Sequence, residues 1–189
     1  MTSMPAPREV EIARVLDFWF RELTPADWFG EGETLDPLVT ARFGVLHERA
    51  VAGDLDDWAR TAHGRLALVL VLDQFSRHIH RGTAQAFAAD AKAQALALEA
   101  IALGIDGQLA LSQRHFLYLP LMHAEDPDLQ RESVAAFEGL RDFVEEVLAF
   151  ARSHEADIAR FGRFPYRNAA LGRTTTEDEA ARLAEREGP

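Results

Sequence analysis

The sequence predicts an all-α protein in which antiparallel helix pairs stack as in a helical-repeat array, with about eight to nine helices. Apolar residues recur at three- and four-residue spacings along the 189-residue chain, which is the period of amphipathic helices. Ala, Leu, Arg and Glu are abundant and favour helices by propensity. Short connections favour antiparallel neighbours. A chain of this length can bury a sufficient core, so we expect a single domain over residues 1–189.

The N-terminal part of the chain predicts two helices. The first, at about 8–22, has one apolar face made by Ile12, Leu16, Trp19 and Leu23. The second begins at Asp36 and Pro37, a capping residue followed by proline at the first helical position, and ends at Gly53. Its predicted core positions are Leu35, Val39, Phe43, Leu46 and Ala50.

The middle of the chain predicts a central helix at about 55–79, because residues 66–72 are apolar on all sides. A buried strand is the alternative for this run, but no turn residue follows it. Asp90 is the predicted cap of a helix over 91–103, and Ser112 that of a helix over 113–125.

The last part of the chain predicts three more helices. One starts at Asp126-Pro127 and ends near Gly139, and the next, over 140–161, has a seam of apolar residues interrupted by His154. After a non-helical stretch over 162–173, Thr175 or Thr176 opens a capping box. We expect residues 175–189 to form a C-terminal helix with a frayed tail.

Composition excludes several classes of partner and site. The 20 Lys and Arg residues face 31 Asp and Glu residues, so the net charge of −11 argues against nucleic-acid and anionic-membrane partners. With no cysteine, the chain has no disulfide, thiolate metal site or cysteine nucleophile. The first 14 residues lack the apolar stretch of an export signal. A cytoplasmic protein without a cofactor is therefore expected.

The first candidate site follows the apolar run, where five polar or turn residues lie close together in sequence: Asp73, Gln74, Arg77, Arg81 and Gly82. Asp73 and Arg77 are four residues apart, so they can pair on one helix face. These residues could form a structural ion pair, with Gln74 capping a neighbouring helix. Alternatively, they line a ligand pocket whose turn is made flexible by Gly82.

A second candidate group comprises Arg114, Tyr118 and His123, and a third is His154 alone. His123 and Glu125 diverge by about 200° on a helix, so this segment by itself does not predict a metal site. Hydrogen bonds to neighbouring helices would explain Tyr118 and both histidines. Proton transfer is the alternative for His154 if it faces Asp73 or His123.

The fourth candidate is the segment 160–173, which has four arginines and no acidic residue. Its candidate ligand-binding residues are Arg163, Arg167, Asn168 and Arg173. Guanidinium groups bind anions through paired N–H donors, so an anion pocket is one prediction. The other is that these arginines pair with carboxylates such as Asp73, Asp90 or Asp126.

Several stretches resemble an uncharacterised bacterial family, the domain of unknown function 924: VLDFWF, LVLDQFSRHIHRGTAQAF, RHFLYLPLMHAED and ARFGRFPYRNAALGR. The resemblance implies an all-α fold similar to tetratricopeptide repeats and supplies no catalytic residue. This chain has Ser76, His78 and Tyr166 where the family usually has proline, asparagine and histidine. The matching positions are Asp73, Gln74, Arg77, Arg81, Gly82, Arg163, Arg167, Asn168 and Arg173.

Three functions are compatible with these patterns. The favoured hypothesis is a helical binding module that holds a peptide or protein partner in a groove with the arginine-rich loop. The alternatives are an enzyme or sensor for a small anionic ligand, and a structural domain with an internal ion-pair network. A homodimer is a further expectation, because some of an aromatic cluster could form a dimer contact: Phe18, Trp19, Phe20, Trp28 and Phe29.

Overall fold

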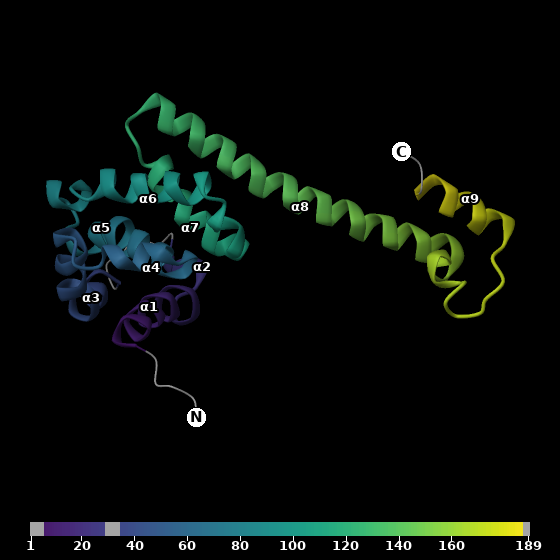
Figure 1. The fold of residues 1–189 in the computed structure, drawn as a ribbon, viewed down its shortest axis with the longest axis horizontal. Helices are drawn as coiled ribbons and strands as arrows, with labels where there is room; N and C mark the ends of the chain where they lie inside the picture. Colours follow the sequence, from purple (N-terminus) through teal and green to yellow (C-terminus); the bar gives the residue numbers. More distant parts are fainter. Residues whose placement is uncertain (1–5, 29–34, 187–189) are drawn as a thin grey trace. The chain divides into compact units, whose positions relative to one another are not determined.

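The computed structural model describes residues 6–28 and 35–186, and within these ranges it is helical with no strand (Figure 1). The all-α prediction is thus confirmed. The described α-helical segments are α1 (Pro7–Asp17), α2 (Pro25–Trp28), α3 (Leu35–Ala52), α4 (Ala62–Leu70), α5 (Ser76–Ile79), α6 (Asp90–Ala102), α7 (Leu111–Met122), α8 (Pro127–Phe161) and α9 (Glu177–Arg186). None of the described helices is long and apolar enough to cross a membrane.

Shorter helical turns link these segments. Two are π-helical, η1 (Phe18–Glu22) and η3 (Val71–Phe75). The others are 3₁₀ turns: η2 (Asp56–Arg60), η4 (Ala84–Phe87), η5 (Ile105–Gln108) and η6 (Pro165–Arg167).

The chain divides into two compact units, residues 1–137 and 138–189, and each is described by itself. The expectation of a single domain stays a prediction. In unit 1, α4 is central and contacts α1, α6 and α7 (Figure 1). All nine of its residues except His63 are buried, as expected for a helix that is apolar on every side. Buried Arg65 ties α4 to α6 by donating to the Leu96 carbonyl and the Glu99 carboxylate.

The predicted helix over 55–79 is present in parts. A 3₁₀ turn covers its start, and Thr61 then caps α4 by accepting from the Gly64 amide at 3.1 Å. The helix continues through the π turn η3 into α5. One extra residue per turn changes the direction of the side chains, and such π turns frequently lie at functional sites.

The aromatic residues proposed for a dimer contact pack largely inside unit 1. Phe18 and Trp19 are fully buried, and Trp19 lies against Phe75 and Phe116. Trp28 also packs on Phe116, with ring centroids 4.9 Å apart. Phe29 lies outside the described residues. The homodimer stays a prediction, now without these buried rings as its surface.

The two helices predicted over 127–139 and 140–161 form one continuous helix, α8, so the predicted stop at Gly139 is wrong. A glycine lowers helix stability by about 1 kcal/mol relative to alanine but does not by itself end a helix. No described atom lies within 4 Å of the position that a Gly139 Cβ would occupy. Neither a close approach nor a positive φ angle therefore requires glycine there.

The C-terminal helix starts with the predicted capping box, in its second alternative. The Glu179 amide donates to Thr176 Oγ1 at 3.2 Å, and the Thr176 amide donates to Glu179 Oε2 at 2.9 Å. In unit 2, α9 packs near the end of α8, where Arg182 donates to Asp157 at 2.8 Å.

Candidate functional site

The centre of the candidate site is Asp73, in the π turn that follows the apolar run. Its side chain is 1% exposed and accepts hydrogen bonds on both carboxylate oxygens. Oδ1 accepts from His123 and lies 3.2 Å from Arg77, and Oδ2 accepts from the Gln74 side chain. A buried carboxylate requires such partners because water no longer solvates it. The predicted pair of Asp73 and Arg77 is thus confirmed, whereas among the described residues Gln74 caps no helix and instead donates to Asp73.

Arg77 uses both terminal nitrogens for contacts within the protein. Nη1 donates to the Ala86 carbonyl at 2.8 Å and to Asp90 Oδ1 at 3.0 Å. Nη2 donates to Asp90 Oδ2 at 3.0 Å and contacts Asp73. Three hydrogen bonds and one ion-pair contact thus involve these two nitrogens, which carry four of the five N–H groups of a guanidinium. Arg77 therefore holds two carboxylates in place, and its two terminal nitrogens are not available as paired donors to an anion.

Asp90 illustrates a tertiary contact that replaced a predicted local one. The N-cap of α6 is Ala89, and Asp90, the predicted cap, is already the first helical residue. Its carboxylate still lies near the helix N-terminus, where the helix dipole favours negative charge. Its hydrogen bonds, however, go to the Arg77 guanidinium.

His123 follows the last residue of α7 and is held by Asp73. Its Nδ1 lies 2.9 Å from Asp73 Oδ1, and its side chain is 28% exposed. Because an ionised carboxylate only accepts, we assign the shared proton to Nδ1 of His123. Nε2 is then the ring atom that remains for a ligand. A carboxylate that fixes one ring nitrogen in this way orients the other for binding or proton transfer.

Arg77, Asp90 and His123 border a pocket of about 700 Å³ within unit 1. A volume of this size is in the range of small-molecule sites, roughly 300–1,000 Å³. Its walls come from α5, η4, α6 and the end of α7, and they are formed by Arg77, Phe87, Ala88, Asp90, Ala91, Gln94, His123 and Glu125. Within the described residues, no group of three or more metal-binding side chains occurs, in the pocket or elsewhere.

Arg81 belongs to a separate polar cluster. It binds Asp36 through Nε and Nη2, and His78 Nδ1 lies 2.7 Å from Asp36 Oδ1. The hydrogen bond from Arg81 lowers the pKa of Asp36, whereas burial lowers the pKa of His78. Gly82 adopts a φ angle of 77° in the turn after Arg81, a conformation that favours glycine. Arg81 and Gly82 do not line the pocket.

Two of the residues at which this chain departs from the family pattern make interior contacts of their own. Ser76 is fully buried, and its Oγ lies 2.6 Å from Nε2 of His47. Burial lowers the pKa of His47, and His80 beside it lowers that pKa further. His78 contributes to the Asp36 cluster, so both departures have a structural role in unit 1.

Arg114 and Tyr118 contact Asp106, which is 9% exposed. Tyr118 donates its hydroxyl to Asp106, and Arg114 lies 3.4 Å from the same carboxylate oxygen. Burial raises the pKa of Tyr118 to about 12, and the bond to Asp106 adds to this shift. Neither residue lines the pocket. Arg114 and Tyr118 therefore share a chain segment with His123 but do not belong to the same site.

In unit 2, Arg163 and Asn168 converge on a single carboxylate. Arg163 binds Glu179 through Nε at 2.6 Å and Nη2 at 2.9 Å, and Asn168 Nδ2 donates to Glu179 at 3.1 Å. These contacts, led by the hydrogen bond from Arg163, lower the pKa of Glu179 to about 2. Carboxylate pairing of the loop was one predicted alternative, but its partner is Glu179, not Asp73, Asp90 or Asp126.

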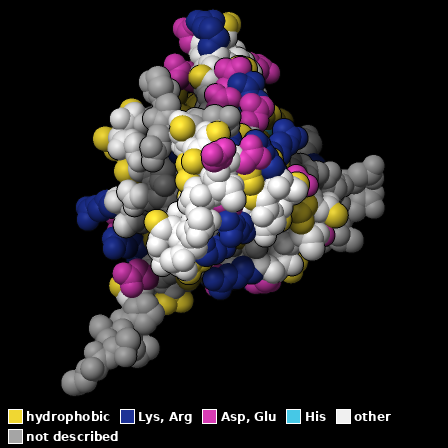
Figure 2. All heavy atoms as spheres, turned by 90° about the vertical axis from the view of Figure 1, so that its right-hand side faces the viewer, with side chains coloured by type: hydrophobic (Ala, Val, Ile, Leu, Met, Phe, Trp, Pro, Cys, Tyr) yellow, Lys and Arg dark blue, Asp and Glu magenta, His cyan; other side chains and the backbone are white. Residues whose placement is uncertain are grey.

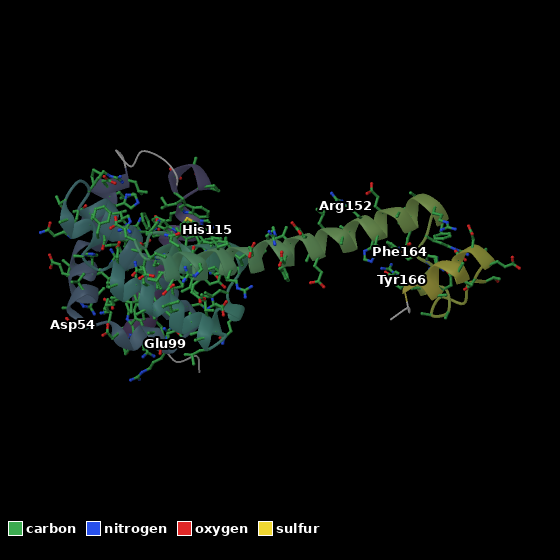
Figure 3. All side chains as sticks on the ribbon, turned by 90° about the horizontal axis from the view of Figure 1, so that it is seen from above. Asp54, Glu99, His115, Arg152, Phe164 and Tyr166 are labelled. Carbon is green, nitrogen blue, oxygen red and sulfur yellow. The ribbon has the colours of Figure 1, made fainter. Side chains whose placement is uncertain are left out.

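Arg167, Arg173 and His154 have other surroundings, and two of these residues contact the rings of Phe164 and Tyr166, which are labelled in Figure 3. The Arg167 guanidinium lies 4.7 Å from the ring centre of Phe164, and it donates to the Tyr166 hydroxyl at 3.2 Å. His154 packs on Phe164, with ring centroids 5.4 Å apart. Arg173 Nε is buried without a hydrogen-bond partner among the described residues. These residues belong to unit 2, whereas Asp73, Arg77 and His123 belong to unit 1.

Charges of both signs lie side by side on the face drawn in Figure 2, where blue and magenta side chains alternate. In unit 2, Arg160 pairs with Asp178 at 2.9 Å, next to the Arg163 and Glu179 pair. Half of the arginines in the segment 160–173 are thus neutralised by acidic residues of α9.

Sequence reasoning did not select six of the eight pocket residues as site candidates: Phe87, Ala88, Asp90, Ala91, Gln94 and Glu125. Phe87 could have been found, because a large aromatic residue in a polar turn is unusual. Gln94 and Glu125 have no comparable signal, since isolated polar residues on helices are mostly solvated.

Comparisons with known proteins agree with the sequence resemblance. The model of the family described as bacterial protein of unknown function (DUF924) matches residues 15–187. A solved structure of a protein of unknown function from Agrobacterium tumefaciens is 38% identical. The similarity covers 94% of this chain and 98% of that chain, with a TM-score of 0.60. No curated protein matches the sequence.

Proposed function

Because the chain belongs to the bacterial DUF924 family, which brings no assigned activity, we propose its function from the pocket of unit 1. The protein is a helical binding module, and part of a peptide or protein partner enters this pocket. The observation that carries the proposal is the His123 ring, which borders the pocket and is fixed by the buried Asp73. A side chain held in this way is preorganised for recognition.

The rest of unit 1 supports a binding role. Helices α4, α6 and α7 contact one another, and α6 and α7 are joined by the short segment that contains η5, which fits the proposed tetratricopeptide-like layer of helix pairs. Buried Arg65 anchors α6, which forms one wall of the pocket, to α4. A cytoplasmic location is part of the same proposal.

The test compares two tryptophan substitutions on α6, probed with an immobilised library of random peptides. Ala91→Trp fills the pocket without changing a charge, and Ala95→Trp adds the same bulk at an exposed alanine outside it. We expect the wild type and Ala95→Trp to bind the same peptides and Ala91→Trp to lose them. Retention of these peptides by Ala91→Trp would contradict the proposal, as would a wild-type protein that binds none.

The same histidine supports a second candidate function, an enzyme that acts on a small ligand. With Nδ1 bound to Asp73, Nε2 of His123 can take a proton from a bound molecule or from water. Incubation of the protein with a bacterial metabolite extract, followed by mass spectrometry, tests this. We expect a compound that the wild type consumes and His123→Gln leaves unchanged. An extract that both proteins leave unaltered would contradict the enzyme hypothesis.

A further inference from the structure

The pocket of unit 1 contains an imbalance between its positive and negative groups. Both terminal nitrogens of its guanidinium, on Arg77, already contact acceptors inside the protein. Its exposed carboxylate, on Glu125, makes no hydrogen bond or ion pair with any residue that the structure describes. The charged group of the pocket that is still available to a ligand is therefore the Glu125 carboxylate, an anion.

The formal charges lead to the same result. Asp90 and Glu125 in the pocket wall carry two negative charges, and the buried Asp73 adds a third directly behind Arg77 and His123. Arg77 carries one positive charge. The sum stays negative whether His123 is neutral or protonated. An anionic ligand would meet net repulsion in this pocket, whereas a cation would be attracted.

The remaining wall suits the carbon chain that carries such a cation. Phe87 is 60% exposed, and Ala88 and Ala91 add small apolar surface beside it. Long basic side chains and alkylamines bury their methylene stems on such surfaces. The second lone pairs of Asp90, and Nε2 of His123 when the ring is neutral, can accept the N–H donors of an ammonium or guanidinium group.

We infer that the pocket of unit 1 takes a cationic group on an aliphatic stem, a primary ammonium or a guanidinium. The inference rests on the proposed function, in that it requires the pocket to be a ligand site. Glu125 supplies the ion pair, Phe87 covers the stem, and His123 accepts one hydrogen bond. The cation can belong to a lysine or arginine of a peptide or to a free amine.

The experiment is an NMR titration of the full, ¹⁵N-labelled chain with three probes of equal carbon number: n-butylammonium chloride, sodium butyrate and butanol. We expect butylammonium to shift the amides of residues 87–94 and 123–125, and butyrate to leave them in place. Glu125→Gln should weaken butylammonium binding about fivefold, the upper range for an exposed ion pair. Glu132→Gln, an exposed glutamate of α8 outside the pocket, is the matched control and should bind like the wild type.

The outcomes separate the inference from the proposed function. If butyrate or butanol shifts the pocket amides more strongly than butylammonium, the pocket binds ligands but the cationic class is wrong. Equal affinity of Glu125→Gln and the wild type for butylammonium would also overturn the inference. If no probe shifts these amides and Ala91→Trp keeps all peptide binding, both fail. Tighter binding of Nα-acetyl-lysine amide, whose side-chain ammonium is free, than of butylammonium would support a peptide source. The reverse would support a free amine.

Discussion

Gly64 provides a sharp test of the packing around the central helix. It is the third residue of α4, and its amide bonds to the capping Thr61. A Cβ added here would lie 2.2 Å from the Trp58 carbonyl oxygen and 2.8 Å from Thr61 Oγ1. Ordinary van der Waals contact begins near 3.4 Å, so the carbonyl contact would be 1.2 Å too short. We therefore expect Gly64→Ala to force apart the 3₁₀ turn and the helix.

Two opposing effects decide the size of the change. Alanine favours a helix over glycine by about 1 kcal/mol. Overpacking a rigid site costs about 1–3 kcal/mol or more, and the atom in the way is backbone, which cannot rotate aside as a flexible side chain does. Trp58 is 1% exposed, so the turn that carries this carbonyl cannot simply move into solvent. The clash should win, with a net loss of about 1–2 kcal/mol in the free energy of unfolding.

Gly44 in α3 is the matched control, because no described atom lies within 4 Å of its added Cβ. Gly44→Ala should raise the free energy of unfolding by about 0.5–1 kcal/mol through helix propensity alone. Urea denaturation followed by tryptophan fluorescence measures both, since the three tryptophans, Trp19, Trp28 and Trp58, all lie in unit 1. The melting temperatures should differ by about 4–10 °C. Equal stability of the two variants would refute the packing argument.

Three further predictions follow from the polar clusters. Asp73→Asn should lower the free energy of unfolding in urea by about 2–3 kcal/mol, because the bonds to Arg77 and His123 lose their charge. Tyr118 keeps its proton longer in the native state, so unit 1 should lose stability as the pH rises from 10 to about 12. Tyr118→Phe should abolish this loss, and absorbance at 295 nm should show one fewer ionisation near pH 12. The lowered pKa of Glu179 stabilises unit 2 above pH 4.5, and this contribution should vanish as the pH falls towards about 2. Protection of the α9 amides from hydrogen exchange should fall with pH over this range in the wild type, whereas in Glu179→Gln it should not depend on the pH in this way.

The helices were predictable because their information is local. A 3.6-residue period marks the buried face of each helix, and a central helix buried all round requires only the run of apolar residues over 66–72. The continuation of α8 through Gly139 was not predictable in the same way. A penalty of about 1 kcal/mol acts against the hydrogen bonds on both sides of it, and here the helix continues to Phe161.

The candidate site was predictable only where its contacts were short in sequence. The pairing of Asp73 with Arg77 follows from their spacing of four residues on a helix. The bond between Asp73 and His123 joins residues 50 positions apart, and the Arg77 and Asp90 pair crosses from one helix to another. Such contacts depend on how α7 and α6 pack on α4, which no local pattern reveals.

Counting charges in a sequence window gave a misleading result for both units. The segment 160–173 contains four arginines and no acid, yet Arg163 is satisfied by Glu179, which lies just beyond that window in the capping box of α9. Conversely, the segment around Arg77 looks basic, although its guanidinium is enclosed by carboxylates. What a ligand meets is the charge left after internal pairing. On that basis Glu125, which has no pairing partner among the described residues, carries more information about the ligand than the conspicuous arginines do.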